Sequence, residues 1–170
     1  MNNVLVPVSD LPSSHDAVRR VVEEFARNPA MRIHLINVRR PLSRRASQFV
    51  RRSLREDYHR ERAEVALKPA RDILEHNGIP YSVHTYIGDA ATIIAQEATR
   101  LACDHIVMSA ARKGSITRMI EASTTERVLD LTKVPVELVL SNAVSKLERY
   151  AVPAAVGSAL AVLLVDLVMD

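Results

Sequence analysis

The segment from Met108 to Val128, MSAARKGSITRMIEASTTERV, contains residue types that could hold a phosphate group. It follows an apolar run that is typical of a buried strand. Arg112 could bind phosphate through two donors, and Ser123 and Thr124 add hydroxyl groups. Gly114 is the only glycine of the segment, whereas loops that bring backbone close to phosphate usually have several. The segment therefore indicates a rebuilt anion site, the remains of one, or an ordinary loop.

Ser123 also begins a pattern that needs no ligand. Ser123 and Glu126 are spaced as in a capping box, which predicts a helix from residue 123 to about residue 133. A capping serine contributes about 1 kcal/mol by accepting a first-turn N–H. The serine therefore has a structural interpretation beside the functional one.

The rest of the chain offers little that could carry catalysis. Its six histidines are scattered, and no pair at helical spacing has a third ligand close in sequence, so we expect no metal site. Nucleophile-elbow, Walker A and zinc-protease motifs are absent from the sequence. Cys103, the single cysteine, reads as a small buried hydrophobe in a reducing compartment. We expect no catalytic residues and a protein that is not an enzyme.

The elements that position these residues alternate along the chain. Its 170 residues, 48% of them apolar, are enough for one domain with a sizeable core. Strands are predicted at residues 3–8, 31–38, 80–86, 104–108 and 135–140, with helices between them, the longest at about 43–76 with a kink or break at Pro69. This alternation predicts an α/β fold: a five-stranded parallel sheet, strand order 3-2-1-4-5, with helices on both faces. Ligands bind such sheets at the carboxyl ends of strands, here the loops after Val8, Val38 and Met108.

Three stretches, VLVPVSD, YIGDAATIIAQEATRLACDHIVMSA and ASTTERVLDLTKVPVELV, make residues 2–140 similar to the universal stress protein family. The resemblance implies a flavodoxin-like or Rossmann-like sheet and a homodimer paired through the last strand, Pro135 to Leu140. It also implies a cytoplasmic stress-response or regulatory role, with ATP binding in some members and at most slow ATP hydrolysis.

The chain departs from the ATP-binding members of that family at each glycine of their motif. The three glycines of the motif fall on Ser109, Arg112 and Ala122, and all three are replaced. Only the last motif residue, Ser123, is retained. The acid expected after the first strand is shifted by one residue, so that Ser9 precedes Asp10. The candidate nucleotide-site residues are Ser9, Asp10, Val38, Ser109, Arg112, Ser123 and Thr124. Either the cleft is degenerate and binds no cofactor, or ATP or AMP binds a cleft rebuilt around Arg112 and Ser123, or another anion binds there.

Residues 39–62 form a basic segment with nine arginines against three acids. Arg44, Arg51, Arg52 and Arg55 fall near one helix face. They predict either a surface for an anionic partner or membrane, or the solvated face of an amphipathic helix. The segment lacks interleaved aromatic residues, so no specific nucleic-acid binding is expected.

The end of the chain is almost wholly apolar between residues 151 and 165. We expect a universal stress domain at residues 1–141 and an apolar extension at 142–170 that forms a hydrophobic helix. A helix that is apolar all round must be buried in protein or lipid. It could dock on its own domain or a dimer partner, or attach the protein peripherally to a membrane, or remain exposed. The N-terminus predicts no secretory signal, which favours a cytoplasmic location.

Overall fold

The computed structural model describes residues 2–11, 13–41, 52–111 and 117–141. In chain order its elements are β1 (Asn3–Pro7), α1 (Ser14–Arg27), β2 (Arg32–Arg39), α3 (Arg52–His76), β3 (Tyr81–Ile87), α4 (Ala90–Arg100), β4 (His105–Ala111), α5 (Thr117–Leu131) and β5 (Val136–Ser141). The predicted helix at 43–51 and the apolar extension at 142–170 lie outside the described residues, as do Arg44, Arg51 and Arg112.

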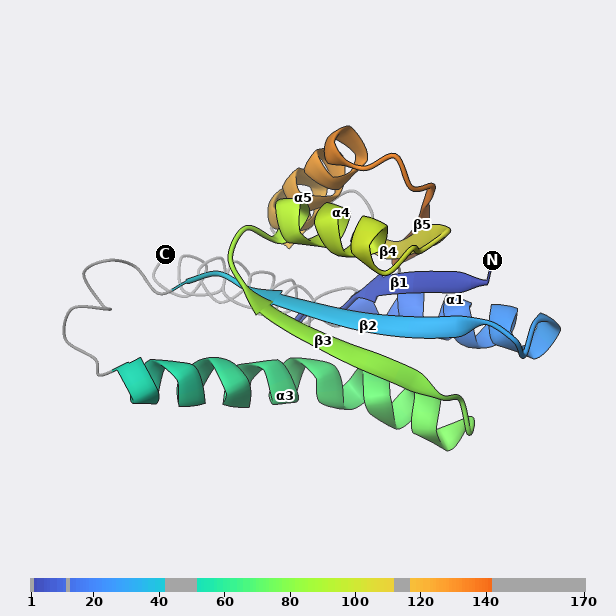
Figure 1. Cartoon of the computed structure of the whole chain (residues 1–170), viewed down its shortest axis with the longest axis horizontal. Coiled ribbons are helices and arrows are strands. Elements are labelled where there is room, and N and C mark those ends of the chain that lie inside the picture. The colour runs from blue at the N-terminus through green and yellow to red at the C-terminus, as the bar shows by residue number, and fades with distance from the viewer. Residues whose placement is uncertain (1, 12, 42–51, 112–116, 142–170) are drawn as a thin grey trace, which may run out of the picture.

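The five strands form one parallel sheet in the order β3-β2-β1-β4-β5, which confirms the predicted fold class and strand order. Helices α1 and α3 cover one face of the sheet, and α4 and α5 cover the other (Figure 1). Starting from β1, the chain adds β2 and β3 on one side of that strand. It then adds β4 and β5 on the other side, and all these connections are right-handed crossovers. Strand order therefore reverses between β1 and β4, where such sheets hold their ligands.

Each face of the sheet has its own apolar core, because successive strand residues point to opposite sides. On the α1 and α3 face, Val6 and Leu35 pack with helix residues that include Leu74. On the α4 and α5 face, Leu5 and Ile36 pack with residues that include Ile94 and Val128. The continuous apolar runs seen in the sequence follow from this two-sided burial.

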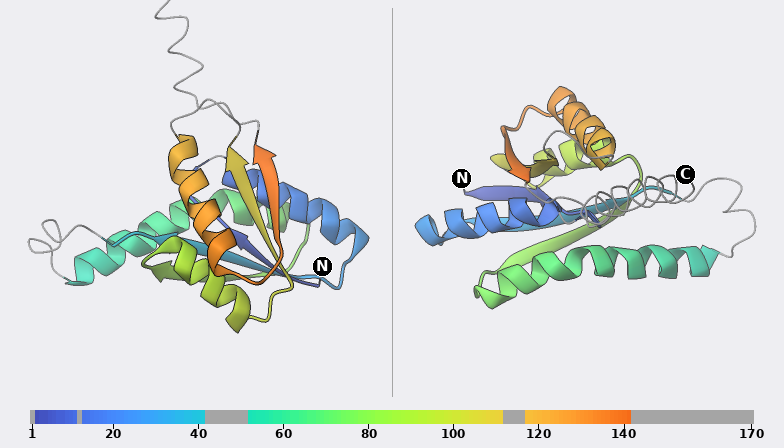
Figure 2. Two further views of the ribbon diagram at one scale, coloured as in Figure 1. Left: turned by 90° about the horizontal axis from the view of Figure 1, so that it is seen from above. Right: turned by 180° about the vertical axis from the view of Figure 1, so that it is seen from behind.

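The pairing between β1 and β4 is short. Only Val4 with His105 and Leu5 with Ile106 are in register there, whereas β1 and β2 pair over residues 3–7. The carboxyl halves of β1 and β4 therefore diverge, and β4 and β5 turn away from the other three strands (Figure 2). This divergence opens the sheet at the point where its strand order reverses.

Helix α3 is continuous from Arg52 to His76, so the predicted break at Pro69 does not occur. The helix ends at His76, as the sequence predicts, and Asn77 and Gly78 follow it. Gly78 has φ +65, a left-handed conformation that costs a side chain free energy. Ile79 N–H donates to Leu74 O at 3.0 Å and satisfies a carbonyl of the last turn.

The predicted cap at Ser123 is wrong. Helix α5 begins at Thr117, so Ser123 lies inside it and not at its N-terminus. Residues 118–122 are mostly good helix formers, and they extend the helix upstream of the local capping signature. At the start of α4 the side chain of Asp89 is the cap, because it accepts from Thr92 N–H at 3.0 Å.

Candidate functional site

A cavity of about 190 Å³ lies at the carboxyl ends of β1, β2 and β4, where the sheet opens. Its lining is mostly apolar and comes from every layer of the fold: Pro7, Val8, Ser9, Leu11, Ser14, Ile36, Val38, Arg40, Ala90, Ile94, Met108, Ser109, Thr124 and Thr125. The three loop positions predicted from the strand ends, after Val8, Val38 and Met108, therefore meet at one site.

The structure brings together four of the seven candidate residues. Ser9, Val38, Ser109 and Thr124 line the cavity. Asp10 follows a lining residue but is not among the lining side chains. Ser123 is exposed and does not line the cavity either, because it lies on α5 at a position where the next two residues, Thr124 and Thr125, face the cavity instead.

The hydroxyl of Ser109 is already used by the protein. Strand β4 extends three residues beyond the predicted Met108, so Ser109 is a strand residue rather than part of a loop. Its side chain is buried, and its Oγ accepts the backbone N–H of Ala17 at 3.0 Å. Ala17 is the fourth residue of α1 and closes its first turn. The serine at the first motif position thus ties α1 to the sheet.

The hydroxyls at the end of β1 are used in the same way. Ser9 Oγ accepts Leu11 N–H at 3.3 Å. Ser14 Oγ is 2.8 Å from Leu11 O and 3.0 Å from Ser9 O, so its proton is directed to carbonyls of this loop. These contacts hold the loop after β1 against the start of α1.

Asp10 is held by two arginines. Its carboxylate accepts from Arg39 at 2.6 Å and from Arg62 at 2.9 Å. Arg39 ends β2 and Arg62 lies on α3, so the carboxylate joins the loop after β1 to two other elements. The acid that is shifted by one residue in the sequence is therefore engaged in ion pairs on the α3 side of the sheet.

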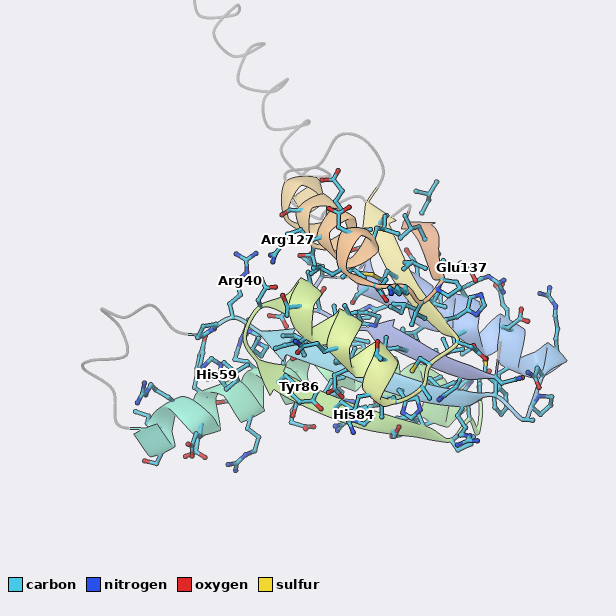
Figure 3. All side chains as sticks on the ribbon, turned by 45° about the horizontal axis from the view of Figure 1, so that its top comes forward. Arg40, His59, His84, Tyr86, Arg127 and Glu137 are labelled. Atoms are coloured by element: carbon cyan, nitrogen blue, oxygen red, sulfur yellow. The ribbon has the colours of Figure 1, made fainter. Side chains whose placement is uncertain are left out.

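Arg40 brings charge to the cavity and was missed in the sequence. It is the only charged residue among the described lining residues, and it projects from the end of β2 (Figure 3). Its spacing from Ile36 and Val38 follows the strand alternation that places all three on one side. That alternation is the signal that could have identified it.

Beside the cavity, Arg127 of α5 binds the cap residue of α4. Its guanidinium donates to the two carboxylate oxygens of Asp89 at 2.7 and 2.9 Å. These bonds, followed by those from Thr92, hold the pKa of Asp89 well below its usual range. The two helices that cover this face are thereby joined by a fork-like ion pair.

Within the described residues, no group of three or more histidine, cysteine, aspartate or glutamate side chains is arranged to hold a metal ion. The lone Cys103 is buried, and burial raises the pKa of its thiol to about 11. A thiol of that kind is a poor nucleophile and a poor metal ligand at neutral pH. In the part of the chain with described structure, no helix is long and apolar enough to cross a membrane.

The fold and the cavity define an open α/β protein with a cavity at the switch point of its sheet. The model of the universal stress protein family matches residues 1–139, and the chain belongs to that family. A search of curated proteins found no match.

Solved structures of the family share the fold. The hypothetical protein MJ0577 has a TM-score of 0.68 at 20% identity, covering 84% of this chain and 98% of its own. A universal stress protein in complex with cAMP has a TM-score of 0.61 at 18% identity, covering 81% and 96%. A family member from Arabidopsis thaliana with AMP bound has a TM-score of 0.57 at 18% identity, covering 84% and 94%. At these identities the likeness establishes the fold, and the ligands belong to those proteins.

Proposed function

We propose that this chain is a non-enzymatic regulatory protein of the universal stress type in which the nucleotide cleft is degenerate. The observation that carries the proposal is the use of the polar groups around the cavity by the protein itself. Ser109 Oγ is bonded to α1, and Asp10 is bonded to two arginines. A ligand that used the Ser109 hydroxyl would have to displace its buried bond to α1, which contributes about 0.5–1.5 kcal/mol. A ligand that used Asp10 would have to compete with two exposed ion pairs.

The size of the cavity supports the same proposal. Its volume of about 190 Å³ is below the roughly 300–1,000 Å³ of typical ligand sites. Its lining offers apolar surface for a flat base but few unused polar groups for the sugar. The chain would then regulate through protein contacts, with or without a weakly held ligand.

A nucleotide-dependent switch is the second candidate. Arg40 and Thr124 support it, because they supply a cation and a hydroxyl at the cavity. Relatives of the same fold were solved with cAMP and with AMP. In this alternative a nucleoside monophosphate or ATP binds with its anionic end near Arg40, and the bound state changes the affinity for a partner.

Calorimetric titration of the full chain with AMP, cAMP and ATP separates the two candidates. The degenerate-cleft proposal predicts no saturable binding by the wild type. It also predicts binding by a variant that restores the acid after β1 and the three motif glycines, Ser9→Asp combined with Ser109→Gly, Arg112→Gly and Ala122→Gly. Tight binding by the wild type, reduced in Arg40→Ala but not in the matched surface control Arg60→Ala, would refute that proposal and establish the switch.

We also propose that two copies pair through β5 in the cytoplasm. Strand β5 forms an edge of the sheet, and Leu138 and Leu140 are 40% and 59% exposed on it. Apolar side chains on an unpaired edge favour pairing with another strand, and a second copy offers the matching edge. Light scattering should give a dimer mass for the wild type and a monomer mass for Leu140→Arg. A monomeric wild type would exclude this pairing.

An anionic partner or membrane surface remains a proposal for the basic segment and the apolar extension. Arg55 is the one predicted basic-face residue whose side chain is described, and it is half-buried on α3. Sedimentation with anionic lipid vesicles, compared with neutral vesicles, tests this interaction. Equal sedimentation with both would exclude electrostatic attachment.

A further inference from the structure

Two histidines meet on the open part of the sheet, away from the cavity. His34 of β2 and His84 of β3 lie on the face that carries α4, with His34 Nδ1 at 3.3 Å from His84 Nε2. Strand register explains the contact, because His34 pairs with Ser82 and His84 follows two residues later on the same side. Strand β3 is an edge strand, and both rings are only half-buried, so solvent reaches them. Figure 3 shows His84 and Tyr86 along this strand.

The protonation of the His34 ring is fixed by Asn3 of β1. The Asn3 amide nitrogen donates to Leu101 O at 2.7 Å and to Ala102 O at 3.1 Å. This orients the Asn3 amide oxygen toward His34 Nε2 at 2.7 Å. Because an amide oxygen only accepts, Nε2 carries the ring proton. In the neutral ring Nδ1 then carries a lone pair, and Ser82 Oγ at 2.6 Å and His84 Nε2 at 3.3 Å both lie beside it.

We propose that His34 and His84 together chelate one divalent transition-metal ion, with Zn²⁺ as the ion to test. Two nitrogens bound to a tetrahedral ion at about 2.0–2.1 Å lie roughly 3.3–3.4 Å apart, which is the separation found here. The bond from His34 Nε2–H to Asn3 matches the outer contact that usually orients a ligating histidine. Imidazole ligands suit zinc, copper and nickel.

Two protein ligands make this an open, exchangeable site. The carboxylate of Glu97 on α4 is held by Arg100 through bonds of 2.8 and 2.6 Å. Ser82 Oγ lies 2.6 Å from His34 Nδ1; with an ion in place it would turn to a metal-bound water. Water then occupies the remaining coordination positions. The site therefore binds the ion more weakly than a site with four protein ligands would.

Zinc titration of the chelator-treated full chain by calorimetry tests the proposal. We expect one ion per chain, with affinity at least about tenfold weaker in His34→Gln and in His84→Gln, and about 10–100-fold weaker in Asn3→Ser. The exposed His76→Gln is the matched control and should bind as the wild type does. Cobalt in place of zinc should give visible bands that each of the two ligand variants abolishes.

The thermal midpoints of the variants without metal show whether each one folds. Zinc should raise the midpoint of the wild type and of His76→Gln, but not of the two ligand variants. If the wild type binds no zinc, the two histidines form a hydrogen bond only and the proposal fails. It fails equally if folded His34→Gln and His84→Gln bind as tightly as the wild type. Because this site is separate from the cavity, neither result bears on nucleotide binding.

Discussion

Replacing Ser109 with alanine should destabilise the protein, although serine and alanine are similar in size. The hydroxyl accepts Ala17 N–H at 3.0 Å, and Ser109 is only 9% exposed. Ala17 N–H also has an intrahelical acceptor, the carbonyl of the N-cap residue Ser13, so alanine removes the bond to the sheet without orphaning the donor. The change therefore removes one buried link between α1 and β4.

Loss of one intramolecular hydrogen bond costs about 0.5–1.5 kcal/mol of unfolding free energy. For a protein of this size each kcal/mol lowers the melting temperature by about 2–4 °C. We therefore expect Ser109→Ala to melt about 1–6 °C below the wild type. Ser109→Gly, which restores the family glycine, should lose roughly a further 0.5–1 kcal/mol because glycine in a strand has more freedom when unfolded.

Urea denaturation followed by circular dichroism measures these differences, with unchanged slopes indicating the same unfolded state. Ser109→Thr is the matched control, because it keeps the hydroxyl and places its extra methyl group toward the cavity. If the unfolding free energy of Ser109→Ala is within about 0.5 kcal/mol of the wild-type value, the hydrogen bond to α1 does not stabilise the helix. The Ser109 hydroxyl would then be available to a ligand.

Three further changes test other parts of the fold. Gly78→Ala should lower the unfolding free energy by about 1–2 kcal/mol, because alanine is strained at the φ of +65 found there. Gly78→Asn should lower it by less, and equal losses would show that backbone strain is not the cause. Leu74→Ala should cost about 2–5 kcal/mol in denaturant, because the side chain is fully buried between α3 and the sheet; a loss under 1 kcal/mol would mean that α3 packs loosely. Asp89→Asn should destabilise the protein at neutral pH. The folded pKa of Asp89 is lowered from 3.8, so its contribution is present above that pH and is lost as the pH falls below it. A difference from wild type that stays constant from about pH 7 to pH 2 would rule out the ion pair with Arg127 as its source.

The sequence predicts the fold well because its signals are local and agree with one another. Each strand is a short apolar run between turn residues, and each helix has a start or stop signal such as Asp89 or Gly78. Alternation of the two element types then leaves few chain paths that keep crossovers right-handed. The strand order is confirmed for this reason.

The site is predicted less well because its chemistry depends on distant partners. The sequence places Asp10 near the cleft, but Arg39 and Arg62, which bind it, lie 29 and 52 residues away. The capping pattern at Ser123 fails because the helix continues upstream from Thr117. A local pattern cannot tell whether the preceding residues also become helical.

The histidine pair could not be inferred from spacing along the chain. His34 and His84 are separated by 50 residues, and only the register of β2 against β3 brings them together. Once two strands are known to be adjacent, a histidine in each on the same face becomes a useful signal. The orienting role of Asn3 depends on a third strand and is visible only in the structure.

The short ladder between β1 and β4 has a consequence for how the native protein opens. Two register pairs join the halves of the sheet, and α1 is the main element that packs across both, with Arg20 reaching Glu137 of β5 at 2.7 Å. Amide hydrogen exchange should therefore divide the sheet into two cooperative units that meet at this line. The cleft lies where they meet, so any ligand that fills it would protect amides in both units at once.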